Sequence, residues 1–175
     1  MSNSENRSAY SLDRQRYGKN PSLLDRHALR FLKLLRHAQE SSNPVWKLQL
    51  LREVERYGLE ISHNAKIGPG LYLGHAYGIT VNSGATIGRN CNLHKGVTIG
   101  QENRGARKGA PTVGDCVWIG VNATVVGAIT IGDDVLIAPN SYVNCDVPSH
   151  SIVLGNPCRI IPRDNATEGY IENTV

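Results

Sequence analysis

The sequence predicts a mostly β protein, a solenoid of short repeats preceded by a short α-helical hairpin. From residue 59 onward, aliphatic residues recur every six positions and glycine often follows them. Before residue 59 the apolar residues follow helical spacing instead. The chain has 18 Gly but a single Phe among 175 residues, so we expect a narrow core of small aliphatic side chains.

Length and composition favour one globular unit and argue against several classes of protein. A chain of 175 residues, 40% of them hydrophobic, is ordinary for a single folded domain. The sequence shows neither a membrane span nor a hydrophobic signal core, so we expect a cytoplasmic protein. The net charge of +4 is mild and the basic residues are scattered, so we expect no nucleic-acid partner.

The cysteines indicate neither a metal site nor a redox motif. No two of them form a CxxC pair, so no metal is expected. In a cytoplasmic protein we expect free and mostly buried thiols. The four residues are Cys91, Cys116, Cys145 and Cys158.

The first 58 residues divide into two segments. Residues 1–19 are polar and rich in Ser and Arg, and they are predicted to be mobile. Residues 20–58 are predicted to form the helical hairpin. Asn20-Pro21 and Asn43-Pro44 have the form of an N-cap followed by proline, and Gly58 is a suitable helix end.

Residues 59–161 carry the hexapeptide rhythm. In each unit two apolar residues lie two apart, so both point inward on a short strand, and glycine with polar neighbours supplies the turn. Three six-residue sides close a triangular coil, and the repeat allows about four coils. The inward aliphatic positions are Ile61, Ile67, Leu73, Val81, Ile87, Leu93, Ile99, Val113, Ile119, Val125, Ile131, Ile137 and Val143.

Two loops interrupt this rhythm. The first is Gly-His-Ala-Tyr-Gly at residues 74–78, and the second is QENRGARKGAPT at residues 101–112. Coil counting places the first loop at the corner between the third and first sides, and the second loop between the first and second sides. Loops on a rigid scaffold are where function concentrates.

The first loop carries a family resemblance. The segment LGHAYGI at residues 73–79, the surrounding coils and GNPCRII at residues 155–161 resemble serine acetyltransferases, which belong to the hexapeptide-repeat acyltransferases. The resemblance covers about residues 20–161, the helical hairpin being similar to a shortened form of that family's N-terminal part. It implies a left-handed parallel β-helix, acetyl-CoA as co-substrate, a homotrimer with sites between subunits, and a role in cysteine biosynthesis.

His75 is the expected catalytic residue. Acetyl transfer from a thioester to a hydroxyl needs a base that works near neutral pH, and histidine has a suitable ordinary pKa of ~6.5. His75 alone among the six histidines lies in an inserted corner loop flanked by glycines. His63 and His94 fall within regular repeat units and are predicted to be turn or surface residues. The remaining three are His27, His37 and His150.

Glu60 is the expected carboxylate partner of His75. A carboxylate can fix the tautomer of the base and stabilise its protonated form. Coil counting stacks Thr80 above Glu60, within about one strand spacing, ~5 Å plus the loop offset, of the His75 corner. Glu60 also matches the carboxylate position that the resemblance implies.

The second loop and several turns are expected to contact the substrates. The two loops lie at different corners of one prism, so both reach a small substrate only if a neighbouring copy supplies the second. The separation of the two loops therefore also predicts a homotrimer. Two such trimers could associate into a hexamer. Phosphates of acetyl-CoA need cations, and turn backbones can contact its pantetheine arm. The candidates are Arg104, Arg107, Lys108 and Arg159 for charge and Gly100, Gly120 and Ala138 for the arm.

The acceptor stays open, because the chain departs from the serine enzymes where they hold serine. Gly74 stands where the family resemblance implies an Asp, Gly109-Ala110 stand for an Arg-His pair, and Asn20 stands for another Asp. Arg107 and Lys108 can partly replace the lost partner of the serine carboxylate. The tail, residues 162–175, ends in Thr174-Val175 and differs from the isoleucine tail that docks the cysteine-synthesising partner enzyme. L-serine, a sugar hydroxyl and a non-catalytic solenoid are therefore the alternatives.

Overall fold

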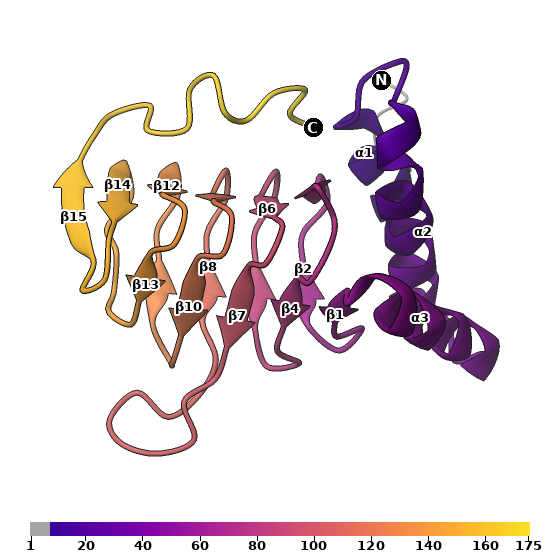
Figure 1. Cartoon of the computed structure of the whole chain (residues 1–175), viewed down its shortest axis with the longest axis horizontal. Helices are drawn as coiled ribbons and strands as arrows, with labels where there is room; N and C mark the ends of the chain where they lie inside the picture. The colour runs from indigo at the N-terminus through magenta and orange to yellow at the C-terminus, as the bar shows by residue number, and fades with distance from the viewer. Residues whose placement is uncertain (1–7) are drawn as a thin grey trace, which may run out of the picture.

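Three helices pack at one end of a β-helix (Figure 1), and the computed structural model describes residues 8–175. The helices are α1 (Ala9–Gln15), α2 (Arg26–Glu40) and α3 (Pro44–Tyr57), and a 3-10 turn, η1 (Leu23–Asp25), precedes α2. None of the helices in the described part of the chain combines the length and apolar character that a bilayer crossing requires.

The prediction that residues 1–19 are mobile is wrong for α1, and residues 1–7 lie outside the described part. Asp13 on α1 is fully buried. Its carboxylate accepts hydrogen bonds from the Arg36 guanidinium at 2.8 and 3.0 Å, and from the backbone N–H groups of Gly70 and Leu71, both at 2.9 Å. A polar helix therefore docks on the prism through an ionic network instead of an apolar stripe.

The start of α2 also differs from the prediction at Asn20-Pro21. Ser22 and Asp25 form a capping box, in which the backbone N–H and the hydroxyl of Ser22 donate to Asp25 Oδ2 at 2.8 and 2.7 Å. This box starts the 3-10 turn and delays the α-helix to Arg26. Helix α3 begins and ends where the sequence predicts. Asn43 caps it, Pro44 is its first residue, and Gly58 ends it at φ 66°.

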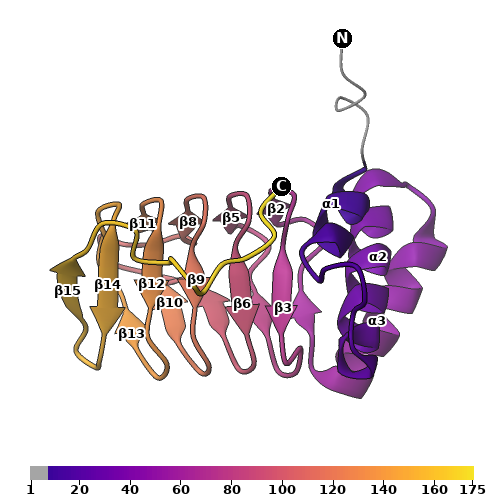
Figure 2. The same cartoon turned by 90° about the horizontal axis from the view of Figure 1, so that it is seen from above.

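The strands form the three faces of a prism, and neighbouring strands within a face run parallel, except for the last strand of the chain (Figures 1 and 2). The first face holds β1 (Glu60–Ile61), β4 (Thr80–Val81), β7 (Thr98–Gly100), β10 (Thr124–Val126) and β13 (Tyr142–Val143). The second holds β2 (Lys66–Ile67), β5 (Thr86–Ile87), β8 (Thr112–Val113) and β11 (Thr130–Ile131). The third holds β3 (Tyr72–Gly74), β6 (Asn92–His94), β9 (Trp118–Ile119), β12 (Val135–Ile137), β14 (Ser151–Leu154) and the antiparallel β15 (Arg159–Pro162).

The solenoid has about five turns, one more than the sequence predicts. The extra turn begins at β13, the last predicted position of the repeat, and is completed by β14, which lies beyond Val143 where the six-residue spacing breaks. Within the prism, Ile61 pairs with Val81 and Val81 with Ile99, and these side chains are at most 2% exposed. The aliphatic rhythm therefore does specify the register.

The cysteines are free, as predicted, but burial holds for only one of them. Cys91 is buried in the core, Cys116 and Cys158 are half-buried, and Cys145 is exposed. The exposed and half-buried thiols lie on turns outside the inward positions of the repeat, which explains the difference.

Residues 163–175, here called the C-terminal strap, run back along the third face from β15 to the helices (Figure 2). The side-chain amide of Asn92 donates to the carbonyl of Tyr170 at 3.1 Å, and Arg16 donates to the carbonyl of Glu172 at 2.9 Å. Asp134 accepts from the backbone N–H groups of Ala166 and Thr167, both at 3.0 Å. The segment is thus fixed at both ends of the prism.

Candidate active site

The two interrupting loops lie at different corners of the prism. The His75 loop follows β3 and leads into β4, between the third and first faces, whereas residues 101–112 follow β7 and lead into β8 (Figure 1). This arrangement agrees with the coil counting. Within one chain, the cavity beside His75 is lined by no residue of the second loop.

The helices hold the His75 loop in place. The Nε2 atom of His27 on α2 lies 3.0 Å from the carbonyl oxygen of Ala76, and its ring packs against Tyr57 and Tyr77. The N–H of Gly78 donates to the carbonyl of Tyr57 at 3.0 Å. His75 itself is exposed and has φ 50°, a left-handed conformation that Asn90 and Asn122 also adopt at turns of the prism.

A small cavity of about 180 Å³ lies beside His75. Ser22, Asp25, Tyr72 and His94 line it together with His75. Asp25 is the only carboxylate among the described residues lining this cavity. Sequence reasoning missed Asp25, because the Asn20-Pro21 signal places it in the interior of a helix.

His94 is the second residue that sequence reasoning missed, since it was predicted to be a turn or surface residue. Its ring lies 4.6 Å from that of Trp118 between centroids, and its Nε2 atom is buried without a hydrogen-bond partner in the described structure. Burial, and to a smaller extent the neighbouring His75, lower the pKa of His94 to about 4. The ring is therefore neutral at pH 7. Coil counting could have found it, because Gly74 pairs with His94 in the β3–β6 register.

Gly74 lies directly beneath the His94 ring. A Cβ atom added at Gly74 would overlap the His94 ring atoms Cε1 and Nδ1. No side chain fits at position 74 while His94 keeps its place. The absence of a carboxylate just before His75 is thus coupled to the presence of His94.

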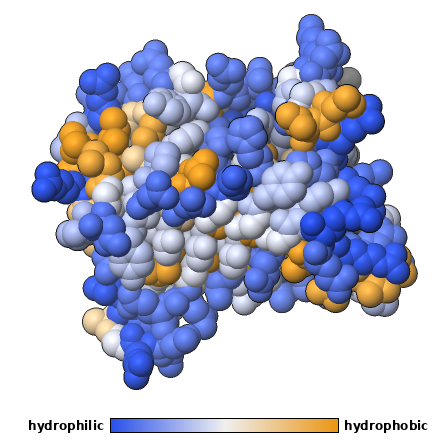
Figure 3. Space-filling model, viewed as in Figure 1, coloured by the Kyte–Doolittle hydropathy of each residue, from blue (hydrophilic) through white to orange (hydrophobic). Residues whose placement is uncertain are grey.

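Glu60 and His75 do not line a common cavity within the chain. Glu60 pairs with Thr80, as coil counting predicts, and its side chain is exposed. It lines a groove of about 720 Å³ between α3 and the first face, which Gly100 also lines. Apolar side chains gather on α3 at this groove (Figure 3), where Leu48 and Leu51 are 56% and 55% exposed.

The predicted basic residues of the second loop are exposed. Arg107 pairs with Glu102 at 3.3 Å, and Arg104 and Lys108 also face solvent. None of the three lines the cavity beside His75. Within one chain, these cations therefore lie apart from the cavity beside His75.

Gly120, Ala138 and Arg159 continue a row along the third face from Gly74 and His94. The β6–β9 and β9–β12 registers place Gly120 next after His94 and Ala138 next after Gly120. Leu154 follows in β14, and Arg159 in β15 pairs with it. Gly100 lies apart, at the corner of the second loop. No group of three or more His, Cys, Asp or Glu side chains among residues 8–175 is arranged to hold a metal ion.

Comparison with known proteins connects this geometry to a family. Residues 110–145 match the family described as bacterial transferase hexapeptide (six repeats). A serine acetyltransferase of Helicobacter pylori is 35% identical over 140 residues, which cover 79% of this chain and 81% of that protein. The chain belongs to the serine acetyltransferase family.

Solved serine acetyltransferase structures share the fold. Soybean serine acetyltransferase complexed with serine superposes with a TM-score of 0.75 at 28% identity, covering 88% of this chain and 68% of that one. A Brucella abortus serine acetyltransferase in complex with coenzyme A gives a TM-score of 0.75 at 26% identity, covering 89% and 67%. This chain is accordingly an acyltransferase, and the non-catalytic alternative is set aside.

Proposed function

We propose that the chain is an acetyl-CoA-dependent O-acetyltransferase in which His75 is the general base. The observation that carries this proposal is an exposed imidazole on a corner loop anchored by α2 and α3, beside a small cavity. Membership in the serine acetyltransferase family supports the same chemistry.

The reaction needs one base and no external oxidant or reductant. His75 takes the proton of the acceptor hydroxyl as its oxygen attacks the thioester carbonyl carbon. The new C–O bond forms, the C–S bond breaks, and the proton passes from His75 to the leaving thiolate of coenzyme A. General-base assistance of this kind contributes typically ~10²–10⁴-fold in rate.

Glu60 is proposed to stabilise protonated His75. Its strand β1 neighbours β4, into which the His75 loop leads. A Glu60→Gln change keeps the size and removes the charge, so we expect a fall in kcat with little change in KM for acetyl-CoA. Unchanged kcat would remove Glu60 from the mechanism.

Acetyl-CoA is proposed to lie along the row from Gly74 to Arg159. Five strand spacings of ~4.8 Å separate these two ends, which is roughly 24 Å. Ala138 is half-buried and leaves its backbone accessible to a pantetheine arm, and the exposed Arg159 can face the phosphates, whereas Gly120 is buried beside Trp118 and Pro139. The bound coenzyme A in the Brucella abortus enzyme supports the co-substrate.

A homotrimer is proposed to complete the site. Arg107, Lys108 and Gly100 lie at a corner that the His75 cavity of the same chain does not reach. A neighbouring prism can bring that corner to His75. Light scattering coupled to size exclusion tests this proposal: three or six copies support it, and a monomer overturns it.

L-serine is the first candidate acceptor. The soybean relative was solved with serine, and Asp25 offers a carboxylate to an ammonium group beside His75. Arg107 and Lys108 of a neighbouring copy can face the serine carboxylate. With this acceptor the product is O-acetylserine, which places the enzyme in cysteine biosynthesis and, we infer, in the cytoplasm.

A sugar hydroxyl is the second candidate acceptor. The observation that favours it is the His94 ring, which covers Gly74. At the position just before the base, where the family resemblance implies a charged Asp, the chain thus has Gly74 beside a neutral imidazole. One assay distinguishes the two candidates: release of the coenzyme A thiol from acetyl-CoA with L-serine or with a panel of sugars. If neither thiol release nor acetyl-CoA binding is seen, the proposed function is wrong.

A further inference from the structure

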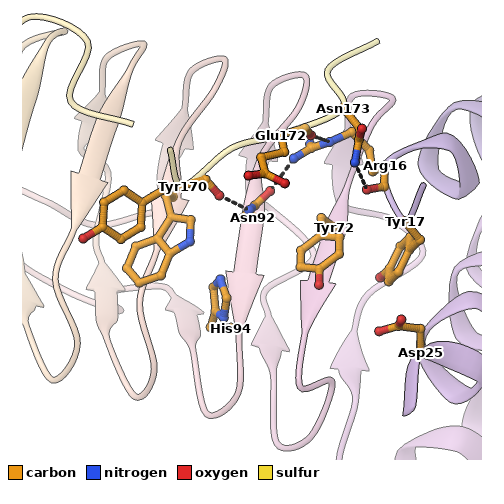
Figure 4. Close-up of a pocket in the computed structure, with 10 residues that line it drawn as sticks. Arg16, Tyr17, Asp25, Tyr72, Asn92, His94, Tyr170, Glu172 and Asn173 are labelled. Carbon is orange, nitrogen blue, oxygen red and sulfur yellow. Dashed lines mark hydrogen bonds between the residues drawn. The ribbon is translucent and has the colours of Figure 1, made fainter. Parts of the chain in front are cut away.

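A second cavity, of about 330 Å³, opens beside the His75 cavity under the C-terminal strap (Figure 4). Its volume lies within the ~300–1,000 Å³ typical of small-molecule sites. Asp25, Tyr72 and His94 line both cavities, so the two lie side by side. The larger cavity has no part in the reaction as described so far.

Aromatic rings line this cavity in a row along the third face. The ring centroids of Tyr17 and Tyr72 are 4.6 Å apart, those of His94 and Trp118 are 4.6 Å apart, and those of Trp118 and Tyr170 are 5.1 Å apart. Tyr17 lies just after α1, and Tyr72 and Trp118 lie on strands β3 and β9 of the prism. Tyr170 lies on the strap. Such a row offers extended apolar surface with polar edges.

The wall that the strap contributes is fixed by buried hydrogen bonds. Arg16 donates to the carbonyl oxygens of Glu172 and Gly70 and to Oδ1 of Asn92, at 2.9, 2.7 and 2.7 Å. Asn92 in turn donates to the carbonyl of Tyr170. Three of the five guanidinium N–H groups of Arg16 are thereby held by the protein. Their acceptors are neutral, so the positive charge of Arg16 stays uncompensated at the cavity that it lines.

The polar groups left for a ligand include carboxylate acceptors and the indole N–H donor of Trp118. The carboxylate of Glu172 makes no hydrogen bond in the described structure, and only Oδ2 of Asp25 is bonded, to Ser22. The Nε2 atom of His94 is buried and unpartnered, and the neutral ring can donate or accept there. Free carboxylates disfavour phosphates and carboxylates, and they accept hydrogen bonds from ammonium groups and from hydroxyl groups.

A pyranose ring has the chemistry that these walls complement. Its C–H faces are apolar and stack on aromatic rings, while its equatorial hydroxyls donate hydrogen bonds at the ring edge. L-serine is small enough for the His75 cavity and leaves Trp118 and Tyr170 without a role. We propose that the cavity under the strap binds the pyranose ring of a carbohydrate acceptor.

This inference rests on the proposed function and specifies its acceptor. Because the two cavities share Tyr72 and His94, a ring held under the strap can present one hydroxyl to His75. That hydroxyl loses its proton to His75, and its oxygen forms the ester bond as the thioester C–S bond of acetyl-CoA breaks. The proton leaves on the coenzyme A thiol.

The test uses the methyl pyranosides of glucose, galactose, mannose and N-acetylglucosamine against L-serine, in the thiol-release assay on the full chain. We expect at least one pyranoside to accelerate thiol release and to be recovered as its acetyl ester. Trp118→Leu and Tyr170→Ser should each lower kcat/KM for that sugar at least tenfold and leave KM for acetyl-CoA unchanged. Tyr170 is 53% exposed, so its variant should keep the fold.

Trp46→Leu is the matched control, since Trp46 stacks on His37 between the helices and lines neither cavity. It should keep kcat/KM for the sugar. Acceleration by L-serine alone, or equal kcat/KM in Trp118→Leu and the control, would overturn the carbohydrate site while leaving O-acetyl transfer intact. Loss of acetyl-CoA binding in the unaltered protein would instead overturn the proposed function itself.

Discussion

The His94 ring occupies the space that a side chain at position 74 would need. The two residues are paired on neighbouring strands of the third face, so the relationship is a register contact. It joins the residue before His75 to a neutral imidazole that lines both cavities. Changing either residue should therefore affect the other.

Gly74→Ala should destabilise the protein by ~1–3 kcal/mol, because the new methyl group overlaps the His94 ring. His94→Ala removes the obstacle, so the double variant should lose less than the sum of the single losses. Urea unfolding of the four proteins measures the coupling. Gly84→Ala is the control, since its Cβ would meet only ordinary contacts at 3.4 Å. Additive losses would contradict the proposed contact.

His94 should make stability depend on pH below neutrality. The folded pKa of about 4 lies below the ordinary value of 6.5, so the unfolded chain binds the proton more readily. The contribution of the neutral, buried His94 ring to the free energy of unfolding is fully present above pH 6.5. It is lost as the pH falls from 6.5 toward 4. Comparing urea midpoints at pH 7 and pH 5 should show a smaller loss in His94→Phe than in the unaltered protein. Equal losses in the two proteins would show that His94 does not titrate in this way.

His75→Ala should lower kcat by ~10²–10⁴-fold with little change in KM for acetyl-CoA. The residue is exposed, so circular dichroism and the oligomeric state should be unchanged. His37→Ala removes a histidine that stacks on Trp46 and serves as the comparison. A His75→Ala enzyme with full kcat would show that another group takes the proton.

Asp13→Ala should cost ~3–5 kcal/mol, because it leaves the buried Arg36 guanidinium without its carboxylate. Replacing both partners, in Asp13→Leu with Arg36→Met, should cost less than the sum of the two single changes. Chemical unfolding provides the measurement. Glu102→Ala removes the exposed ion pair with Arg107 and should cost at most ~1 kcal/mol. Equal costs for the buried and the exposed pair would argue against the network at α1.

The prism was predictable because one physical rule repeats along it. An inward aliphatic residue every six positions requires Ile61, Val81 and Ile99 to stack, and the structure pairs them so. The corner of the His75 loop follows from the same counting. Helix α3 was equally accessible, because Asn43, Pro44 and Gly58 act through local backbone geometry.

What could not be predicted depends on contacts between distant polar residues. Helix α1 docks through Asp13 on the N–H groups of Gly70 and Leu71, and no periodicity marks such a contact. Asn92 and Arg16 hold the strap through Tyr170 and Glu172. These partners lie 78 and 156 residues away in the sequence. His94 was misassigned because the repeat fixes its pairing with Gly74 but not its burial against the ring of Trp118.

The strap also has a consequence for how the molecule comes apart. A stack of repeats, in which each coil touches only its neighbours, tends to fray from its free end. Here the residues after β15 reach the helices at the opposite end and bond to Arg16 there. Opening the last coil therefore also breaks contacts that hold the helices. We expect amide hydrogen exchange to give similar opening free energies for the last coil and for the helices, as for one cooperative unit.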